Sequence, residues 1–443
     1  MRDPNGYVDT SGMVVLRRLY KPLPSTHFLH HPAANKLVID GDLIPFSIRS
    51  DRLIESRKVP FVSYPYEWTH SQLLQAASCT LNVAEVALEG RFEIKDATAF
   101  NVIFRGARAE FCDHLSFEPI TSRYWWAYGQ FLRHFLIPLA ASKLTGVAAS
   151  SAFKTALDGI TLEQGKALLG AHRWRHRIAL AFLQGSGQVI RLTKTEVSST
   201  FTGGSTHLGL IRFLRWQLDG LAKPIGGRSQ WGDYEHTRTH YTEQGLSDKR
   251  SLVGRWMSNI KPQTVLDLGC NQGEFSLLAS DHAGAVIALD ADEASLEKLR
   301  QRLSISGAPI QTVLVSLDDP SPARGWAGSE FASLIDRLEG RADMVLALAL
   351  LHHLVLGCGI SIENVTTLLA RLTRQYLVVE LIPPVDEKAR QVSESHNRQD
   401  SVEIYSLEHQ CAALAAHFSI IEEQPIEGSS RVLALMQKKN THA

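Results

Sequence analysis

The C-terminal half of the chain alternates short apolar runs with longer amphipathic segments. The runs that we expect to form strands are residues 265–268, 286–289, 312–316, 344–349 and 376–380. They are almost entirely apolar, which is typical of parallel strands covered on both faces. Helical spacing of apolar residues occurs between them, for example at residues 292–303 and 364–374. The pattern predicts an α/β sheet of parallel strands, ending in a strand pair at residues 417–423 and 431–437.

The turn after the first run is the most informative segment. Residues 265–278 read VLDLGCNQGEFSLL, in which Asp267 lies near the end of the run and Gly269 and Gly273 follow in a short turn. Asp290 ends the second run, about 20 positions after the glycines, where a carboxylate can accept hydrogen bonds from ribose hydroxyls. Strand, glycine turn and helix together predict a nucleotide-type unit. The spacing alone fits a dinucleotide or an adenosyl ligand, and a turn without ligand is the simplest alternative.

The glycine pattern distinguishes between these ligands. The turn lacks the GxGxxG fingerprint of dinucleotide sites, and a carboxylate in the strand would repel a pyrophosphate. The segment resembles the E/D-x-G-x-G-x-G motif of class I S-adenosylmethionine-dependent methyltransferases, with Asn271 replacing the middle glycine. Asparagine visits left-handed geometry more readily than most residues. The resemblance implies a Rossmann-like seven-stranded sheet and S-adenosyl-L-methionine as cofactor, bound by Asp267, Gly269, Asn271, Gly273 and Asp290.

The same resemblance implies further cofactor contacts. Leu317 and Asp318 follow the third run, where the family holds the adenine, although a polar turn before Pro320 is an alternative. Residues 231–241 read WGDYEHTRTHY and resemble a helical lid that covers the cofactor, with Tyr241 and the later Lys249 as contacts. Ordinary helix packing is the alternative for these residues.

Candidate catalytic residues follow the fourth and fifth runs. The fourth reads ALALLHHL, and we expect that strand to end at residues 350–353 with His352 and His353 in the crevice. Imidazole can take a proton from an attacking group near neutral pH, or one histidine merely caps the strand. Glu380, in VVELIPP, is a third candidate that we expect to face the crevice. The NPPY tetrad of amino-group DNA methyltransferases is missing, which disfavours a nucleobase acceptor.

The N-terminal half contains a second motif. Residues 94–113 read IKDATAFNVIFRGARAEFCD, and the spacing of Asp96, Asn101 and Asp113 resembles the catalytic loop and metal-binding aspartate of kinase-like folds. A hinge strand and a long amphipathic helix are predicted before this loop. No glycine-rich phosphate loop precedes them, and Lys36 and Lys58 are poor matches for the kinase lysine. We therefore expect a degenerate α+β kinase-like domain, the alternative being a polar β-hairpin around Arg105 and Gly106.

Length and composition limit the domain number and the functional classes that are possible for the whole molecule. With 443 residues, two domains are expected: an N-terminal accessory domain at 1–222 and a methyltransferase domain at 231–443, joined by a linker at 221–231. Lys+Arg and Asp+Glu both number 46, so no global field for nucleic acid is expected. Five scattered cysteines, without a CxxC pair, indicate neither a zinc site nor a disulfide framework. The polar N-terminus lacks a signal-peptide core, so a cytoplasmic location without membrane contact is expected.

The motifs SYPYEW, DATAFN, ALALLHHL and VVELIPP resemble bacterial two-part methyltransferases, including nodulation-type proteins. This resemblance implies S-adenosylmethionine-dependent methyl transfer to a small-molecule or saccharide acceptor, with the N-terminal domain binding or presenting substrate. One alternative is a bifunctional protein whose N-terminal domain is an active Mg-ATP-dependent kinase, with Asp96, Asn101 and Asp113 around the metal. The other is a non-catalytic protein that binds the cofactor only.

Overall fold

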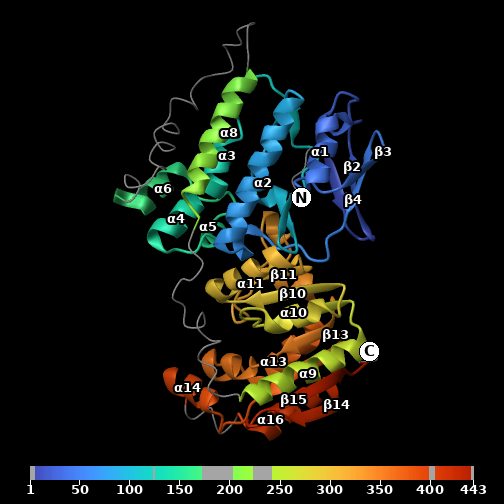
Figure 1. The fold of residues 1–443 in the computed structure, drawn as a ribbon, viewed down its shortest axis with the longest axis vertical. Coiled ribbons are helices and arrows are strands. Elements are labelled where there is room, and N and C mark those ends of the chain that lie inside the picture. Colours follow the sequence, from blue (N-terminus) through green and yellow to red (C-terminus); the bar gives the residue numbers. More distant parts are fainter. Residues whose placement is uncertain (1–4, 123–124, 172–202, 223–241, 399–404, 441–443) are drawn as a thin grey trace. The chain divides into compact units, whose positions relative to one another are not determined.

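The computed structural model describes residues 5–122, 125–171, 203–222, 242–398 and 405–440. The chain divides into two compact units, Met1–Pro224 and Ile225–Ala443, and each is described by itself (Figure 1).

A seven-stranded sheet forms the centre of the C-terminal unit, in the order β11-β10-β9-β12-β13-β15-β14. Its five parallel strands are fully or largely buried, and β15 runs antiparallel to both of its neighbours. The strands are β9 (Thr264–Leu268), β10 (Ala285–Asp290), β11 (Ile310–Leu314), β12 (Ala342–Ala347), β13 (Thr373–Leu381), β14 (Phe418–Pro425) and β15 (Val432–Lys438). The sequence prediction of a Rossmann-like seven-stranded methyltransferase sheet is confirmed.

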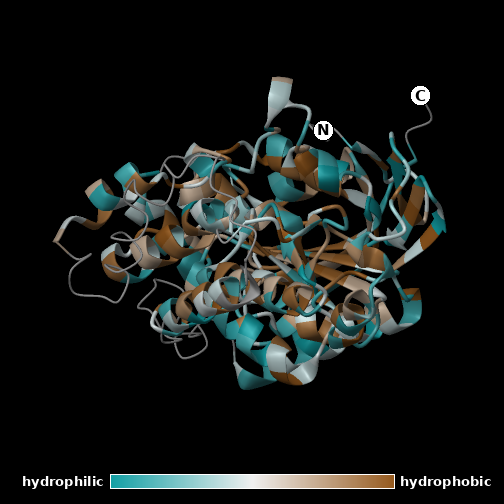
Figure 2. Ribbon diagram, turned by 90° about the horizontal axis from the view of Figure 1, so that it is seen from above, coloured by the Kyte–Doolittle hydropathy of each residue, from teal (hydrophilic) through white to brown (hydrophobic). Residues whose placement is uncertain are grey.

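Helices cover both faces of this sheet. The strands β9, β10 and β11 follow one another toward one edge of the sheet, whereas β12 and β13 follow one another toward the opposite edge. Because connections between parallel strands are right-handed, the helices of the two halves lie on opposite faces. Helix α9 packs on α10, and α13 packs on α16. The hydrophobic strands appear brown between partly teal helices in Figure 2. The helices are α9 (Glu243–Ile260), α10 (Glu274–Ser280), α11 (Glu293–Ser306), α12 (Leu334–Leu338), α13 (Ile362–Leu372), α14 (Glu387–Ser395) and α16 (Leu407–Ala415).

Strand β12 differs from its predicted extent. It ends at Ala347, and residues 351–352 already belong to a helical turn that leads into the π-helical turn η8 (His353–Gly357). Apolar residues continue past the strand because this turn is itself packed in the core, where Leu351 is fully buried. Hydrophobicity alone therefore could not mark the end of the strand.

The N-terminal unit combines a four-stranded antiparallel sheet, in the order β1-β2-β4-β3, with a mainly helical part. The sheet strands are β1 (Gly6–Asp9), β2 (Val14–Leu19), β3 (Phe46–Ser50) and β4 (Leu53–Arg57), and smaller pairs are formed by β5 (Phe92–Ile94) with β8 (Phe117–Pro119) and β6 (Val102–Arg105) with β7 (Arg108–Phe111). The α-helices are α1 (Pro32–Asp40), α2 (His70–Glu89), α3 (Tyr128–Phe131), α4 (Ile137–Thr145), α5 (Ser151–Thr155), α6 (Leu162–Leu169) and α8 (Gly203–Asp219). One apolar core extends from α1 and α2 to α4 and α8.

The long helix predicted before the N-terminal motif is confirmed as α2, which Thr69 caps by accepting a hydrogen bond from the Gln72 N–H. The expected hinge strand before it is absent from residues 61–64, which are irregular and lead into the short 3₁₀ turn η2 (Pro65–Glu67). Leu221, the first residue of the expected linker, is fully buried in the N-terminal core, and residues 223–231 lie outside the described residues. No described helix is both long and apolar enough to span a membrane.

Candidate active site

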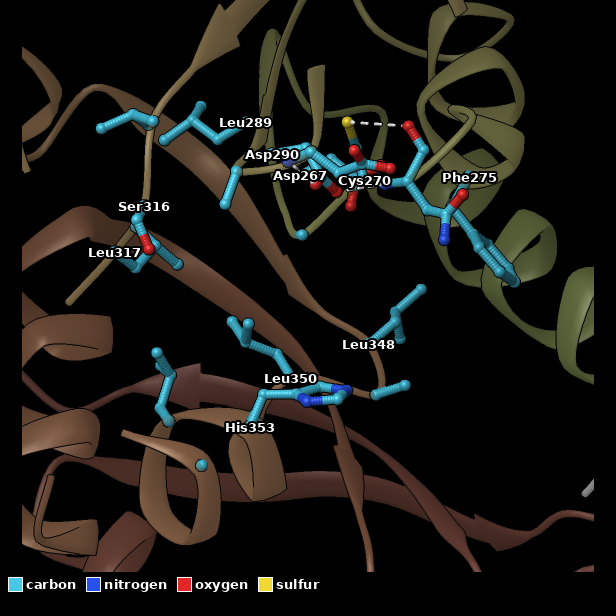
Figure 3. A pocket seen from close by; sticks show the side chains of 18 of the residues that line it. Asp267, Cys270, Phe275, Leu289, Asp290, Ser316, Leu317, Leu348, Leu350 and His353 are labelled. Carbon is cyan, nitrogen blue, oxygen red and sulfur yellow. Dashed lines mark hydrogen bonds between the residues drawn. The ribbon is translucent and has the colours of Figure 1, made fainter. Parts of the chain in front are cut away.

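A pocket of about 610 Å³ opens at the carboxyl ends of the parallel strands, beside the point between β9 and β12 where the strand order reverses. In Figure 3, Asp267, Cys270, Phe275 and Asp290 lie on one side, and Leu348, Leu350 and His353 face them. Ser316 and Leu317 border a third side. The pocket also receives Leu246 and Lys249 from α9, Cys358 from the end of η8, and His396 from the end of α14.

The turn after β9 forms the floor of the pocket. Gly269, Asn271 and Gly273 all have positive φ, of 72°, 50° and 78° respectively, which confirms the left-handed geometry expected for Asn271. A Cβ on Gly273 would collide with the side chain of Leu299, so this position requires glycine for space as well as for φ. The turn thereby brings backbone close to any bound ligand.

Two carboxylates flank the turn, one buried (Asp267) and one partly buried (Asp290). Asp267 accepts a hydrogen bond from the Ser276 hydroxyl at 2.5 Å, and Asp290 accepts from the backbone N–H groups of Asn271 at 2.6 Å and Asp292 at 2.8 Å. Burial raises the pKa of each carboxyl to about 6. A cationic or hydroxyl-bearing ligand would compensate these partly desolvated charges.

Lys249 belongs to a buried charge network that leads away from the pocket. Its Nζ lies 2.6 Å from Glu380 Oε2 and 5.1 Å from the centre of the Phe275 ring. Arg431 Nη1 lies 3.2 Å from the other oxygen of Glu380, while Arg431 Nε donates to Asp386 at 2.8 Å. Burial lowers the pKa of the Lys249 ammonium, and the Glu380 carboxylate opposes that shift.

The expectation that Glu380 faces the crevice is therefore corrected. Its side chain is fully buried, is absent from the pocket lining, and uses both oxygens in the network. The sequence could not indicate this, because Lys249 and Arg431 are distant along the chain. Glu380 acts on the site through Lys249 and makes no contact of its own with the pocket.

The opposite wall is formed by the turn after β12. Ala349 has a φ of 51°, which is uncommon for a residue with a Cβ, and the π-helical turn η8 follows. His353 lines the pocket, whereas His352 is buried behind it with the two rings 4.0 Å apart. Burial, assisted by the positive charges of Arg431, His396 and Lys388, lowers the pKa of His353 to about 4. Its imidazole is consequently neutral at physiological pH.

The structure gathers most of the cofactor residues suggested by the sequence. The predicted residues that line the pocket are Lys249, Asp267, Gly269, Asn271, Asp290, Leu317, Asp318 and His353. Gly273 shapes the turn from behind, and His352 is set back from the pocket. Tyr241, with Trp231 and Tyr234 of the suggested lid, lies outside the described residues.

Several lining residues were not identified from the sequence. Cys270 and Phe275 lie within the recognised motif, and their proximity to the two carboxylates could have been inferred from it. Cys358 and His396 reach the pocket through the packing of α14 on η8, for which the sequence carries no local signal.

In the N-terminal unit, the hairpin β6-β7 connects the two ends of the second motif. Asn101 Nδ2 donates to the backbone carbonyl of Asp96 at 3.3 Å, and burial together with the nearby Asp113 carboxylate raises the pKa of Asp96. Asp113 is paired with Arg17 of β2, at 3.1 Å from Nη1, and accepts from the Leu115 N–H at 3.2 Å. Arg17 was not identified from the sequence, because the only basic residues considered there were lysines, as candidates for the kinase lysine.

Three comparisons relate this architecture to known proteins. No family model matches the chain. The nodulation protein NoeA of Rhizobium meliloti (strain 1021) is 28% identical, over 99% of this chain and 95% of NoeA. Among solved structures, the N-methyltransferase NodS from Bradyrhizobium japonicum WM9 is 13% identical with a TM-score of 0.32, covering 44% of this chain and 97% of NodS. The bifunctional kinase-methyltransferase WbdD is 24% identical with a TM-score of 0.32, covering 49% of this chain and 43% of WbdD. The chain is thus similar to NoeA along its whole length, and its C-terminal unit has the strand order of the class I methyltransferase fold.

Proposed function

We propose that the C-terminal unit binds S-adenosyl-L-methionine and transfers its methyl group to a small-molecule or saccharide acceptor. The observation that carries this proposal is the grouping of Asp267, Asp290 and Lys249 around one pocket at the switch point of the sheet. These three charges match the three polar parts of the cofactor: its amino group, its ribose and its carboxylate.

Each contact follows from the chemistry of the side chain. Asp290 would accept hydrogen bonds from the ribose hydroxyls, Asp267 would face the amino group, and the Lys249 ammonium would pair with the carboxylate. Leu317 and Asp318 would border the adenine, since they follow β11 and line the same pocket. The Phe275 ring, which already lies near Lys249, offers a face that attracts the sulfonium cation.

Methyl transfer requires mainly positioning. When bound, the cofactor would supply an electrophilic methyl group on a sulfonium, whose departure as the neutral thioether of S-adenosylhomocysteine balances the new bond to the acceptor. His353, which is neutral and lies across the pocket from Asp267, would accept a hydrogen bond from the acceptor and orient it. A strong base is not needed at this step, because the sulfonium is already a good leaving group and the proton can be lost as the new bond forms.

For the N-terminal part, residues 1–222, we infer a binding or presenting role without phosphoryl transfer. The Asp113 carboxylate, which a kinase would offer to magnesium, is used by Arg17 and by a backbone N–H. Asn101 is likewise turned to the Asp96 carbonyl. These contacts favour a site that keeps the kinase-like arrangement of residues but has lost the function of its metal ligands.

Calorimetric titration of the full chain with S-adenosylhomocysteine tests the cofactor proposal. We expect one saturable site in the wild type and a loss of affinity of about tenfold or more in Asp290→Asn, which removes the charged acceptor for the ribose. Asp281→Asn, an exposed change at the end of α10, serves as the control and should bind normally. Absence of binding by the wild type, or equal affinities of the wild type and Asp290→Asn, would contradict the proposal.

A further inference from the structure

Helix α9 brings Lys249 to the pocket, and the buried face of this helix begins with a glycine. Within residues 243–250, its first two turns, only Gly245 and Lys249 are buried. The two residues are four positions apart, so they lie on the same face of the helix. The surface against which Gly245 packs therefore also helps to set the position of Lys249.

Gly245 packs against the turn between β14 and β15, residues 426–431, which we call the hairpin turn. A Cβ at position 245 would lie only 2.3 Å from the backbone carbonyl oxygen of Glu427, which is closer than any side chain can approach. A backbone oxygen cannot rotate away as the end of a flexible side chain could. Gly245 is not among the residues with positive φ, so this contact, and not the backbone conformation, requires the glycine.

Thr242 and Gly428 border the same contact. Thr242 Oγ1 caps α9 by accepting from the Gly245 N–H at 2.9 Å, and it donates to the Glu427 carbonyl oxygen at 3.5 Å. A Cβ on Gly428 would lie 2.7 Å from Thr242 Cγ2. The first turn of α9 and the hairpin turn therefore meet with no space for a further carbon atom at either glycine.

The hairpin turn is also connected to Lys249 through buried charges. The Ile426 N–H donates to the Arg431 carbonyl at 3.0 Å and closes the turn. The Arg431 side chain pairs with one oxygen of Glu380, whose other oxygen pairs with Lys249. Helix α9 is thus fixed relative to the hairpin turn at two points, directly at Gly245 and through Glu380 at Lys249.

We propose that Gly245 is a positioning residue for cofactor binding, because its missing side chain lets α9 lie close enough to the hairpin turn to place Lys249 in the pocket. This inference rests on the proposed function, in which Lys249 pairs with the carboxylate of the cofactor. Gly245 itself does not line the pocket and acts only through the helix. An added Cβ would push the first turn of α9 and the hairpin turn apart, and the Lys249 ammonium would move with the helix.

Calorimetry on the full chain with two ligands tests the inference in Gly245→Ala. S-adenosylhomocysteine carries the amino-acid part of the cofactor, whereas 5′-methylthioadenosine lacks it. We expect the affinity for the first ligand to fall about tenfold and the affinity for the second to change by less than about twofold. Gly254→Ala on the same helix is the matched control, because its Cβ would lie 3.5 Å from Leu278 Cδ1, an ordinary contact. It should leave both affinities unchanged, and alanine also favours the helix.

Gly428→Ala disturbs the same contact from the hairpin turn and decides the question if thermal unfolding shows that Gly245→Ala is not folded. It should cause the same selective loss, and Thr242→Ser in that background should restore affinity, because serine lacks Cγ2 but keeps the capping hydroxyl. Equal losses for the two ligands, or an unchanged affinity for S-adenosylhomocysteine, would overturn the inference and leave the cofactor proposal intact. Absence of adenosyl binding by the wild type would overturn both.

Discussion

Asp267 and Asp290 are ionisable residues placed where ionisation is costly. Asp267 is buried and Asp290 is partly buried, and desolvation brings the pKa of each carboxyl to about 6 in the free protein. Hydrogen bonds from Ser276 and from two backbone N–H groups oppose that shift without cancelling it. A ligand with an amino group and hydroxyls would supply the missing stabilisation, so the affinity of the pocket depends on the protonation state of these two residues.

This dependence gives a pH prediction for cofactor binding. A raised pKa means that the carboxyls become protonated below about pH 6, and a protonated Asp267 cannot pair with the cofactor amine. We expect the dissociation constant for S-adenosylhomocysteine to be constant above about pH 7 and to rise roughly tenfold per pH unit below 6 if one carboxylate must be ionised. Calorimetry from pH 5 to 8 measures this dissociation constant. An affinity that does not change down to pH 5 would contradict the proposed roles of Asp267 and Asp290 in cofactor binding.

At the scale of secondary-structure elements, a network of buried charges connects parts of the C-terminal unit that are distant in sequence. Its members are Lys249, Glu380, Arg431 and Asp386. It joins α9, the end of β13, the start of α14 and the residue before β15. All four charges are almost completely buried. Their arrangement holds Lys249 at the pocket and the first turn of α14 beside the end of β13.

Substitution of Glu380 by glutamine should separate the stabilising role of the network from its role in binding. The neutral amide leaves Lys249 without its charged partner and leaves Arg431 paired with Asp386 alone, which we expect to lower the free energy of unfolding by about 3–5 kcal/mol. The affinity for S-adenosylhomocysteine should fall more than that for 5′-methylthioadenosine, which lacks the amino-acid part. Glu422→Gln is the matched control, because its more exposed pair with Arg255 should contribute at most about 1 kcal/mol. Equal losses for the two ligands would exclude a role in holding Lys249.

The element scale also shows how far the sequence can be interpreted. Buried parallel strands appear as apolar runs, so the central strands and the terminal pair could be predicted, as could the glycine turn with its left-handed Asn271. The end of β12 was placed too late because the following helical turn is equally apolar. Glu380 was misplaced, and Arg17 and His396 were missed, because their roles depend on partners or packing far away in the chain. Local patterns determine elements, whereas long-range ion pairs become visible only once the elements are packed.

At the scale of the whole molecule, the chain couples a unit with a methyltransferase fold to a unit whose motif resembles that of kinases. The motif residues Asp96, Asn101 and Asp113 are brought together in the N-terminal unit. The Asp113 carboxylate, which the kinase-like motif would offer to magnesium, is paired with Arg17. Full-length similarity to NoeA indicates that both units occur together in that relative as well.

The two possible activities of the N-terminal unit make opposite predictions for Asp113→Asn. If this unit binds or presents substrate without phosphoryl transfer, the wild type should release no phosphate from ATP with magnesium above the level of Asp113→Asn. S-adenosylhomocysteine affinity should then be the same in both proteins, because Asp113 belongs to the other unit. The same assay with magnesium and ATP also tests the alternative, an active kinase. ATP turnover that disappears in Asp113→Asn would establish the bifunctional enzyme. In that event, nucleotide binding must displace Arg17 from Asp113. Arg17→Gln would then be expected to increase the affinity for magnesium and to leave turnover intact, because the ion pair would compete with the metal for the Asp113 carboxylate.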